Sequence, residues 1–177
     1  MADVQAPLIE TRALKKYFPV GDHSQLHAVD GINLKIYPGE TLGVVGESGC
    51  GKSTLGRTIL RLQEPTDGQI LYDGKDITKY NRRQMKQMRQ NMQLIFQDPY
   101  ASLDPRKSVV EIIAEYMIIN RTYPSKKEIY NYAAHLMDIV GLARRYANAY
   151  PHELDGGRRQ RIGIARALSL HPKFIVC

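Results

Sequence analysis

The sequence has little that would mark a membrane-spanning or secreted protein. No apolar run approaches the roughly 20 residues that a membrane-spanning helix needs. The first residues, Met1 to Pro7, contain neither the basic segment nor the apolar segment of a secretory signal. Only 2 cysteines occur, Cys50 and Cys177, and their wide separation gives no disulfide framework. These absences favour a protein of the reducing cytosol.

The remaining composition is that of an ordinary globular protein. With 177 residues, 43% of them hydrophobic and 24% charged, the chain can bury a core in one domain or in a lobed one. The formal net charge of +7 is compatible with nucleic acid, an anionic membrane surface or a phosphate-rich ligand. No basic stretch is interleaved with aromatic residues in a nucleic-acid pattern, so we expect no direct binding of nucleic acid.

One stretch carries the pattern of a phosphate-binding loop, G-x-x-x-x-G-K-[ST]. Its residues are Gly46, Glu47, Ser48, Gly49, Cys50, Gly51, Lys52, Ser53 and Thr54. The three glycines allow the backbone to bend and to bring its N–H groups close to a chain of phosphates. Lys52 is long enough to reach the β- and γ-phosphates of a nucleotide. Ser53, with Thr54 beside it, is placed to offer its hydroxyl to a magnesium ion.

The flanks of this loop agree with the pattern. Thr41 to Val45 is a short apolar run and predicts a buried strand. The apolar residues after the loop, at spacings that a helix can bury on one side, are Leu55, Ile59, Leu60 and Leu62. A helix here would point its positive N-terminal end at the phosphates. The loop is therefore expected to bind a nucleotide and not to be a ligand-free glycine turn.

The rest of the chain alternates between strand and helix patterns. Strands are expected over residues 8–18, 28–37, 69–72, 92–96 and 173–177, with turns at 21–24 and at Pro38-Gly39. Helices are expected over residues 82–89 after Asn81, 109–120, from Ser125 to Val140, and from Asp155 to the break at His171-Pro172. The two or three strands before the loop would form an antiparallel edge on a parallel core.

Three motifs, in order along nearly the whole chain, resemble the ATPase subunit of ATP-binding-cassette transporters. The first is the loop 46–54, and the second is Gln97, which follows a predicted strand and is similar to the Q-loop of that family. The third is Leu154 to Arg161, which is similar to its signature motif and the helix that follows. A phosphate-binding loop alone fits dozens of ATPase families, but the three motifs at these separations are highly specific.

The resemblance implies an α/β fold, with a P-loop NTPase core, an antiparallel β edge and an inserted α-helical lobe. We expect a nucleotide-binding core over residues 1–97 and a helical lobe over 98–153. Residues 154–177 would form the signature helix and the start of a core strand. Residues 96–106, with the first part of the loop and Pro151-His152-Glu153, are similar to ATPases of oligopeptide and dipeptide importers. ATPases of nickel importers share these features.

The resemblance also assigns roles to single residues, with ATP and Mg²⁺ as the implied ligands. Lys52 and Gln97 are the implied catalytic residues. Ser53 and Gln97 are the implied partners of the magnesium ion. Phe18 is expected to stack on the adenine, with Tyr17 as the alternative; such stacking is worth about 1–3 kcal/mol in nucleic-acid systems.

The same resemblance implies an assembly. The loop 46–54 of one ATPase subunit would face Asp155, Gly156, Gly157 and Arg158 of a second homologous subunit, with ATP between them. Two transmembrane permease subunits would bind this pair at the cytoplasmic face of the cell membrane. An extracytoplasmic peptide-binding protein would take part indirectly.

The signature departs from the usual Leu-Ser-Gly-Gly-Gln at two positions, Asp155 and Arg158. A carboxylate in place of the serine should repel the γ-phosphate unless metal or Arg158 compensates. One alternative is a swapped arrangement, in which Arg158 supplies positive charge to the phosphate. The other is a weakened composite site, as in hetero-dimeric relatives.

The sequence ends where the magnesium-binding aspartate and the water-polarising glutamate of this family should follow. We therefore expect a truncated chain that is nearly incompetent in hydrolysis, because loss of a general base slows a reaction on the order of 10²–10⁴-fold. The full-length protein is expected to be an ATPase. Two other functions stay open. One is a DNA-repair-type cassette ATPase, although such proteins usually carry coiled-coil or zinc insertions, which are not seen here. The other is a nucleotide-binding module without hydrolysis.

Overall fold

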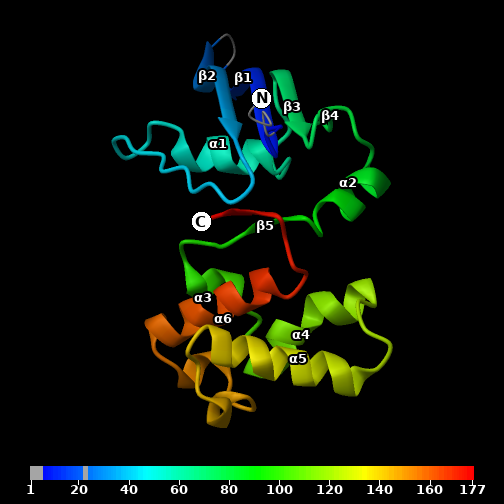
Figure 1. Ribbon diagram of the computed structural model, residues 1–177. Helices are drawn as coiled ribbons and strands as arrows, with labels where there is room; N and C mark the ends of the chain where they lie inside the picture. Colours follow the sequence, from blue (N-terminus) through cyan, green and yellow to red (C-terminus); the bar gives the residue numbers. More distant parts are fainter. Residues whose placement is uncertain (1–5, 22–23) are drawn as a thin grey trace. The chain divides into compact units, whose positions relative to one another are not determined.

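The computed structural model describes residues 6–21 and 24–177. These form two compact units, one ending at Arg89 and the other running from Gln90 to Cys177. Figure 1 shows the elements of each unit. The mixture of helices and sheets confirms the expected α/β class. The expected turn at 21–24 includes residues 22 and 23, which lie outside the described residues.

The first unit is built on a four-stranded antiparallel sheet in the order β2-β1-β3-β4. Its strands are β1 (Ile9–Val20), β2 (Ser24–Ile36), β3 (Asp67–Tyr72) and β4 (Lys75–Asp76). Helix α1 (Lys52–Ile59) contacts β1 and β2, and helix α2 (Arg82–Met88) ends the unit. This sheet confirms the expected antiparallel arrangement of the strands before the loop. Leu62 lies beyond the end of α1 and is half exposed, so its expected place on the buried helix face is wrong.

A bulge in β1 sets which side chains enter the core of this unit. Ile9 and Thr11 alternate in the buried positions, and Leu14 takes the next one after a register shift. Ala13 has a positive φ of 44°, and its N–H donates to the Asn33 side chain at 2.8 Å. The bulge therefore keeps Leu14 on the buried face, with no exposed surface.

The strand expected at Thr41 to Val45 does not form. This segment has no strand partner in the part of the chain that the structure describes, and Val45 is 97% exposed. Apolar content predicts burial, but a strand exists only where a neighbour completes its ladder of N–H and C=O groups. The phosphate-binding loop is thus preceded by an exposed segment without regular secondary structure.

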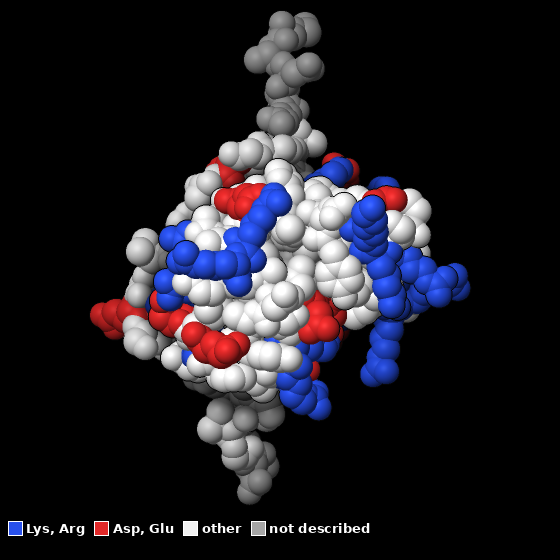
Figure 2. All heavy atoms as spheres, turned by 90° about the horizontal axis from the view of Figure 1, so that it is seen from below, with Lys and Arg blue, Asp and Glu red and all other residues white. Residues whose placement is uncertain are grey.

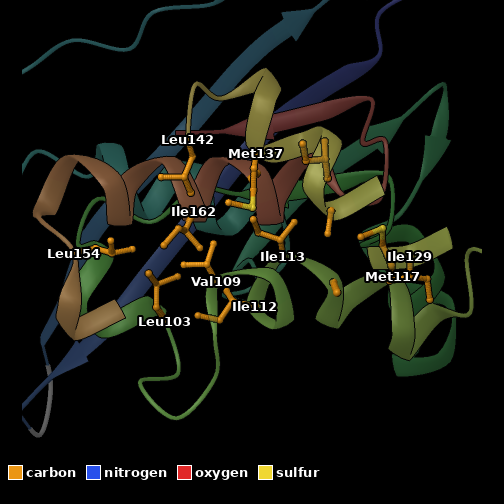
Figure 3. Packing of buried hydrophobic residues seen from close by; sticks show 14 residues of the cluster. Leu103, Val109, Ile112, Ile113, Met117, Ile129, Met137, Leu142, Leu154 and Ile162 are labelled. Atoms are coloured by element: carbon orange, nitrogen blue, oxygen red, sulfur yellow. The ribbon is translucent and has the colours of Figure 1, made fainter. Parts of the chain in front are cut away.

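The second unit packs helices beside a two-stranded parallel sheet. The helices are α3 (Pro99–Ser102), α4 (Val109–Asn120), α5 (Lys126–Ile139), η1 (Arg144–Tyr146), η2 (Pro151–Glu153) and α6 (Gly156–Leu168). The strands are β5 (Met92–Leu94) and β6 (Phe174–Val176). Side chains of α4, α5 and α6 meet in one apolar cluster, which Figure 3 shows. None of the described helices is long and apolar enough to cross a bilayer.

Local capping signals explain where these helices begin and end. Ser108 and Glu111 form a capping box at the start of α4, as Asn81 and Gln84 do for α2. Gly141 ends the α5 segment with a positive φ of 68°, which glycine adopts without strain. The sequence prediction of a helix over 109–120 is confirmed at both ends.

The division into compact units differs from the predicted domain boundaries. It falls after Arg89, so β5 and β6 group with the helices. The boundaries at 97/98 and 153/154 stay predictions.

Candidate functional site

The phosphate-binding loop leads directly into α1 through Gly51. This residue is the N-cap of the helix and has a left-handed φ of 94°. A methyl group at this position would overlap the backbone carbonyl oxygen of Ala28 in β2. Glycine is therefore required here both by the backbone conformation and by the close approach of β2.

The ammonium group of Lys52 lies inside the loop. Its Nζ donates to the carbonyl oxygens of Gly46 at 2.8 Å and Glu47 at 2.6 Å, and lies 3.6 Å from Cys50 Sγ. The loop thus curls around a positive charge that is only partly covered. Anionic oxygens brought into the loop would be stronger acceptors for this ammonium than the two carbonyls.

The start of α1 adds donors to the same place. Among the described residues no side chain caps this helix, and its first turn contains no acidic residue. By helix geometry, the N–H groups of Lys52, Ser53 and Thr54 have no carbonyl one turn earlier within the helix. Ser53 is exposed and Thr54 is half-buried. The loop therefore combines a cation, free helix N–H groups and an accessible hydroxyl.

Two neighbouring aromatic residues lie on β1 near this loop. Tyr17 pairs across the sheet with His27, and Phe18 pairs with Leu26. These partners precede Ala28, the residue that Gly51 approaches. The part of the β1–β2 hairpin that carries these two aromatic residues therefore lies next to the point where the loop approaches β2.

Their surroundings differ. The Tyr17 hydroxyl donates to Asp30 Oδ1 at 2.5 Å, and its ring stacks on His27 with centroids 3.8 Å apart. The hydrogen bond to Asp30 raises the pKa of Tyr17 to about 12. Phe18 makes no such bond, and Lys16 Nζ lies 4.9 Å from its ring centroid. Because Tyr17 is already engaged, these contacts favour Phe18 for stacking on a base, which stays a prediction.

Gln97 lies in the second unit, shortly after β5. The strand is short, but Ile95 extends its pairing by donating its N–H to Val176 at 2.8 Å. Gln97 is exposed, and Asp98 next to it caps α3 by accepting from the N–H of Tyr100 at 2.8 Å. Gln97 and the loop belong to separate compact units, so a site that combines them stays a prediction.

The signature residues form the first turn of α6. Asp155 is the N-cap, as predicted, and its Oδ1 accepts from the N–H of Arg158 at 2.8 Å. Its other oxygen pairs with Arg158 Nη1 at 2.5 Å. The Arg158 guanidinium also lies 4.9 Å from the ring of Tyr146. The two residues that depart from the usual signature are therefore bound to each other.

Sequence reasoning missed two buried arginines of α6, Arg159 and Arg166. They are 7% and 9% exposed, although charged side chains are seldom buried so deeply. Their spacing of seven residues, two helical turns, was the available signal. What they contact depends on how α3 packs, and the sequence pattern does not give this.

Comparison with known proteins agrees with the family that the three motifs resemble. The model of the family described as ABC transporter matches residues 29–177. The chain is 50% identical over 170 residues to the oligopeptide transport ATP-binding protein OppF of Bacillus subtilis, covering 96% of this chain and 55% of that protein. It is 43% identical over 180 residues to the dipeptide transport ATP-binding protein DppF of Escherichia coli, covering 99% and 54%. The chain thus spans about half the length of the curated relatives it matches.

Among solved structures, the chain is similar to the ATP-binding cassette MJ0796 in a dimeric post-hydrolysis state bound to ADP and phosphate. The TM-score is 0.87 at 29% identity, covering 94% of this chain and 72% of the other. It is also similar to CbiO1 from Clostridium perfringens, with a TM-score of 0.80 at 27% identity, covering 97% and 64%.

Proposed function

Because the chain belongs to the ABC transporter family, we propose that it forms the ATP-binding part of a peptide importer. The names of the relatives, oligopeptide and dipeptide transport ATP-binding proteins, support peptides as the cargo. The observation that most directly supports ATP binding is the position of the Lys52 ammonium. It lies 2.8 and 2.6 Å from two carbonyl oxygens of the loop.

The loop fits a magnesium-bound triphosphate in its donor set. Lys52 would exchange its two carbonyl acceptors for β- and γ-phosphate oxygens. The uncapped start of α1 would add N–H groups to the same anion. Ser53 would provide a hydroxyl oxygen of the kind that magnesium prefers. Bound magnesium supplies charge neutralisation at the phosphate oxygens. Gln97 would orient the attacking water.

The assembly is part of the same proposal. A second homologous ATPase subunit would complete the nucleotide site, and two permease subunits would bind the pair at the cytoplasmic face of the membrane. The similarity to a cassette described as dimeric supports the first partner. A peptide-binding protein outside the cell would act indirectly.

The net charge of +7 is compatible with nucleic acid, so the distribution of the basic side chains has to be considered. On the face shown in Figure 2, Lys and Arg side chains lie in separate groups with Asp and Glu side chains between them. Nucleic-acid binding uses a continuous basic patch or stripe. This face therefore does not support a DNA-repair role.

Titration of MgATP into the purified chain tests the proposal. We expect saturable binding of one nucleotide per chain. Absence of binding would overturn the proposed function.

Modification of Cys50 provides a second test. Its thiol is exposed and lies 3.6 Å from Lys52 Nζ, so a maleimide attached there would fill the space proposed for phosphate. We expect alkylation to abolish MgATP binding, and saturating MgATP to slow alkylation by at least about tenfold, as expected for a ligand that covers the thiol. The Cys177→Ala background leaves Cys50 as the single thiol. Equal alkylation rates with and without MgATP would show that the nucleotide does not cover this loop.

Asp155→Asn separates charge from helix capping in the signature. Asparagine caps a helix about as well as aspartate, so α6 should keep its stability. Removing a carboxylate about 4 Å from a phosphate relieves roughly 1 kcal/mol of repulsion in water. We expect MgATP-dependent self-association, measured by light scattering, to tighten roughly fivefold, the equivalent of that energy.

The double variant Asp155→Asn/Arg158→Gln distinguishes the two alternatives for the signature. If the site is weakened by Asp155 alone, the double variant should keep the tighter MgATP-dependent self-association of Asp155→Asn. If Arg158 binds the phosphate in a swapped arrangement, the double variant should lose that tighter self-association. No gain in Asp155→Asn itself would contradict repulsion by this carboxylate.

A further inference from the structure

The two buried arginines of α6 lie on the same face of that helix, seven residues apart. In the described chain neither forms an ion pair with an acidic residue. Arg159 Nη1 has no hydrogen-bond partner among the described residues, although it is buried. Because burial of an uncompensated guanidinium is unfavourable, other contacts must hold these side chains.

Those contacts reach α3. The Arg159 guanidinium lies 3.9 Å from the centroid of the Tyr100 ring, and its Nε donates to the carbonyl of Pro151 at 2.6 Å. Arg166 Nη1 donates to the carbonyl of Ser102 at 2.6 Å. One arginine therefore contacts the middle of α3 and the other contacts its last residue.

The α3 side chains that the structure describes, Tyr100 and Ser102, do not belong to the apolar cluster of this unit. Tyr100 is 67% exposed despite its contact with Arg159, and Gln97 is exposed. The arginine contacts tie this segment to α6 at Tyr100 and Ser102.

Both ends of this attachment adjoin parts of the proposed nucleotide site in this unit. Arg159 directly follows the signature residues 155–158, and Asp98 joins Gln97 to the N-terminus of α3. Fixing α3 to α6 thus fixes the chain next to Gln97 relative to the signature turn.

We propose that Arg159 and Arg166 are positioning residues that hold the Gln97 segment against the signature helix, Arg159 by stacking on Tyr100 and Arg166 through the Ser102 carbonyl. This role rests on the proposed function, in which both segments meet nucleotide. Neither arginine contacts the reacting atoms.

The test measures access to position 97 directly. Gln97→Cys is introduced in a Cys50→Ser/Cys177→Ser background, and the rate of labelling by a maleimide is measured without nucleotide. Arg159→Met keeps much of the side-chain volume but removes the cation, and Tyr100→Leu removes the ring. We expect either change to raise the labelling rate roughly two- to fivefold, the size expected from losing one cation–π contact on a largely exposed ring. Tyr100→Phe should keep the parent rate.

Arg161→Met is the matched control on the same helix. Arg161 Nη1 donates to the carbonyls of Val140 and Gly141 at the end of the α5 segment, away from α3. Its loss should lower the thermal unfolding temperature without changing labelling at position 97. Thermal unfolding of every variant shows whether the fold is retained.

Unchanged labelling in folded Arg159→Met and Tyr100→Leu would overturn the proposal, as would an equal increase in Arg161→Met. If Arg159→Met does not fold, Tyr100→Leu and its Tyr100→Phe partner decide the question, because Tyr100 is exposed. The labelling needs no nucleotide, so its result is independent of whether ATP binds the loop.

Discussion

Gly51→Ala is expected to abolish detectable MgATP binding. A non-glycine residue pays roughly 1–2 kcal/mol to adopt the left-handed conformation that Gly51 has, with φ at 94°. The new methyl group would also overlap the carbonyl oxygen of Ala28, which is backbone and cannot rotate away. The start of α1 must then move away from β2, and the Lys52 ammonium moves with it. Titration calorimetry should show affinity lower by at least about a hundredfold, an energy of roughly 3 kcal/mol.

Gly49→Ala is the matched control for this change. Gly49 also has a positive φ, 83°, but a methyl group there would meet no atom within 4 Å. The control therefore carries the conformational strain without the overlap, and we expect a smaller loss of affinity. Wild-type binding by Gly51→Ala would show that the approach of β2 to the loop is not needed for the site.

Lys52→Ala is expected to have the second large effect. Hydrogen bonds to charged groups contribute about 1.5–3 kcal/mol each, and Lys52 is proposed to make two with phosphate oxygens. Their loss corresponds to a drop in MgATP affinity of roughly 10²–10⁴-fold. The fold should survive, because in the described structure Nζ contacts atoms of the loop itself.

Arg57→Ala removes the same formal charge from the other end of α1. Arg57 is exposed in the last turn of the helix. We expect its MgATP affinity to stay within about twofold of wild type, since an exposed charge a helix length away is largely screened. Equal losses in the two variants would mean that net charge, and not the contact made by Lys52, determines binding.

The parts of this fold that were predictable have their causes within a few residues of sequence. Helix α4 carries both an apolar spacing and a capping box at Ser108, and its predicted ends are confirmed. Asp155 was predicted as an N-cap and is one, because the capping bond runs from a side chain to a backbone group three residues on. Such signals need no knowledge of tertiary packing.

The parts that were not predictable depend on distant partners. The run at 41–45 has the composition of a strand, yet the described structure gives it no neighbour to pair with. The burial of Arg159 depends on Tyr100, 59 positions earlier in the sequence. The sequence favoured Phe18 over Tyr17 for stacking on the base, but the bond from Tyr17 to Asp30 became visible only in the paired hairpin.

The most direct test of the account is a structure of this protein with magnesium and a non-hydrolysable ATP analogue. The account predicts the triphosphate over residues 46–54, with the Ser53 hydroxyl at the metal. Lys52 Nζ should have left the carbonyls of Gly46 and Glu47 for phosphate oxygens. An analogue bound elsewhere, with Lys52 still donating to those two carbonyls, would contradict it.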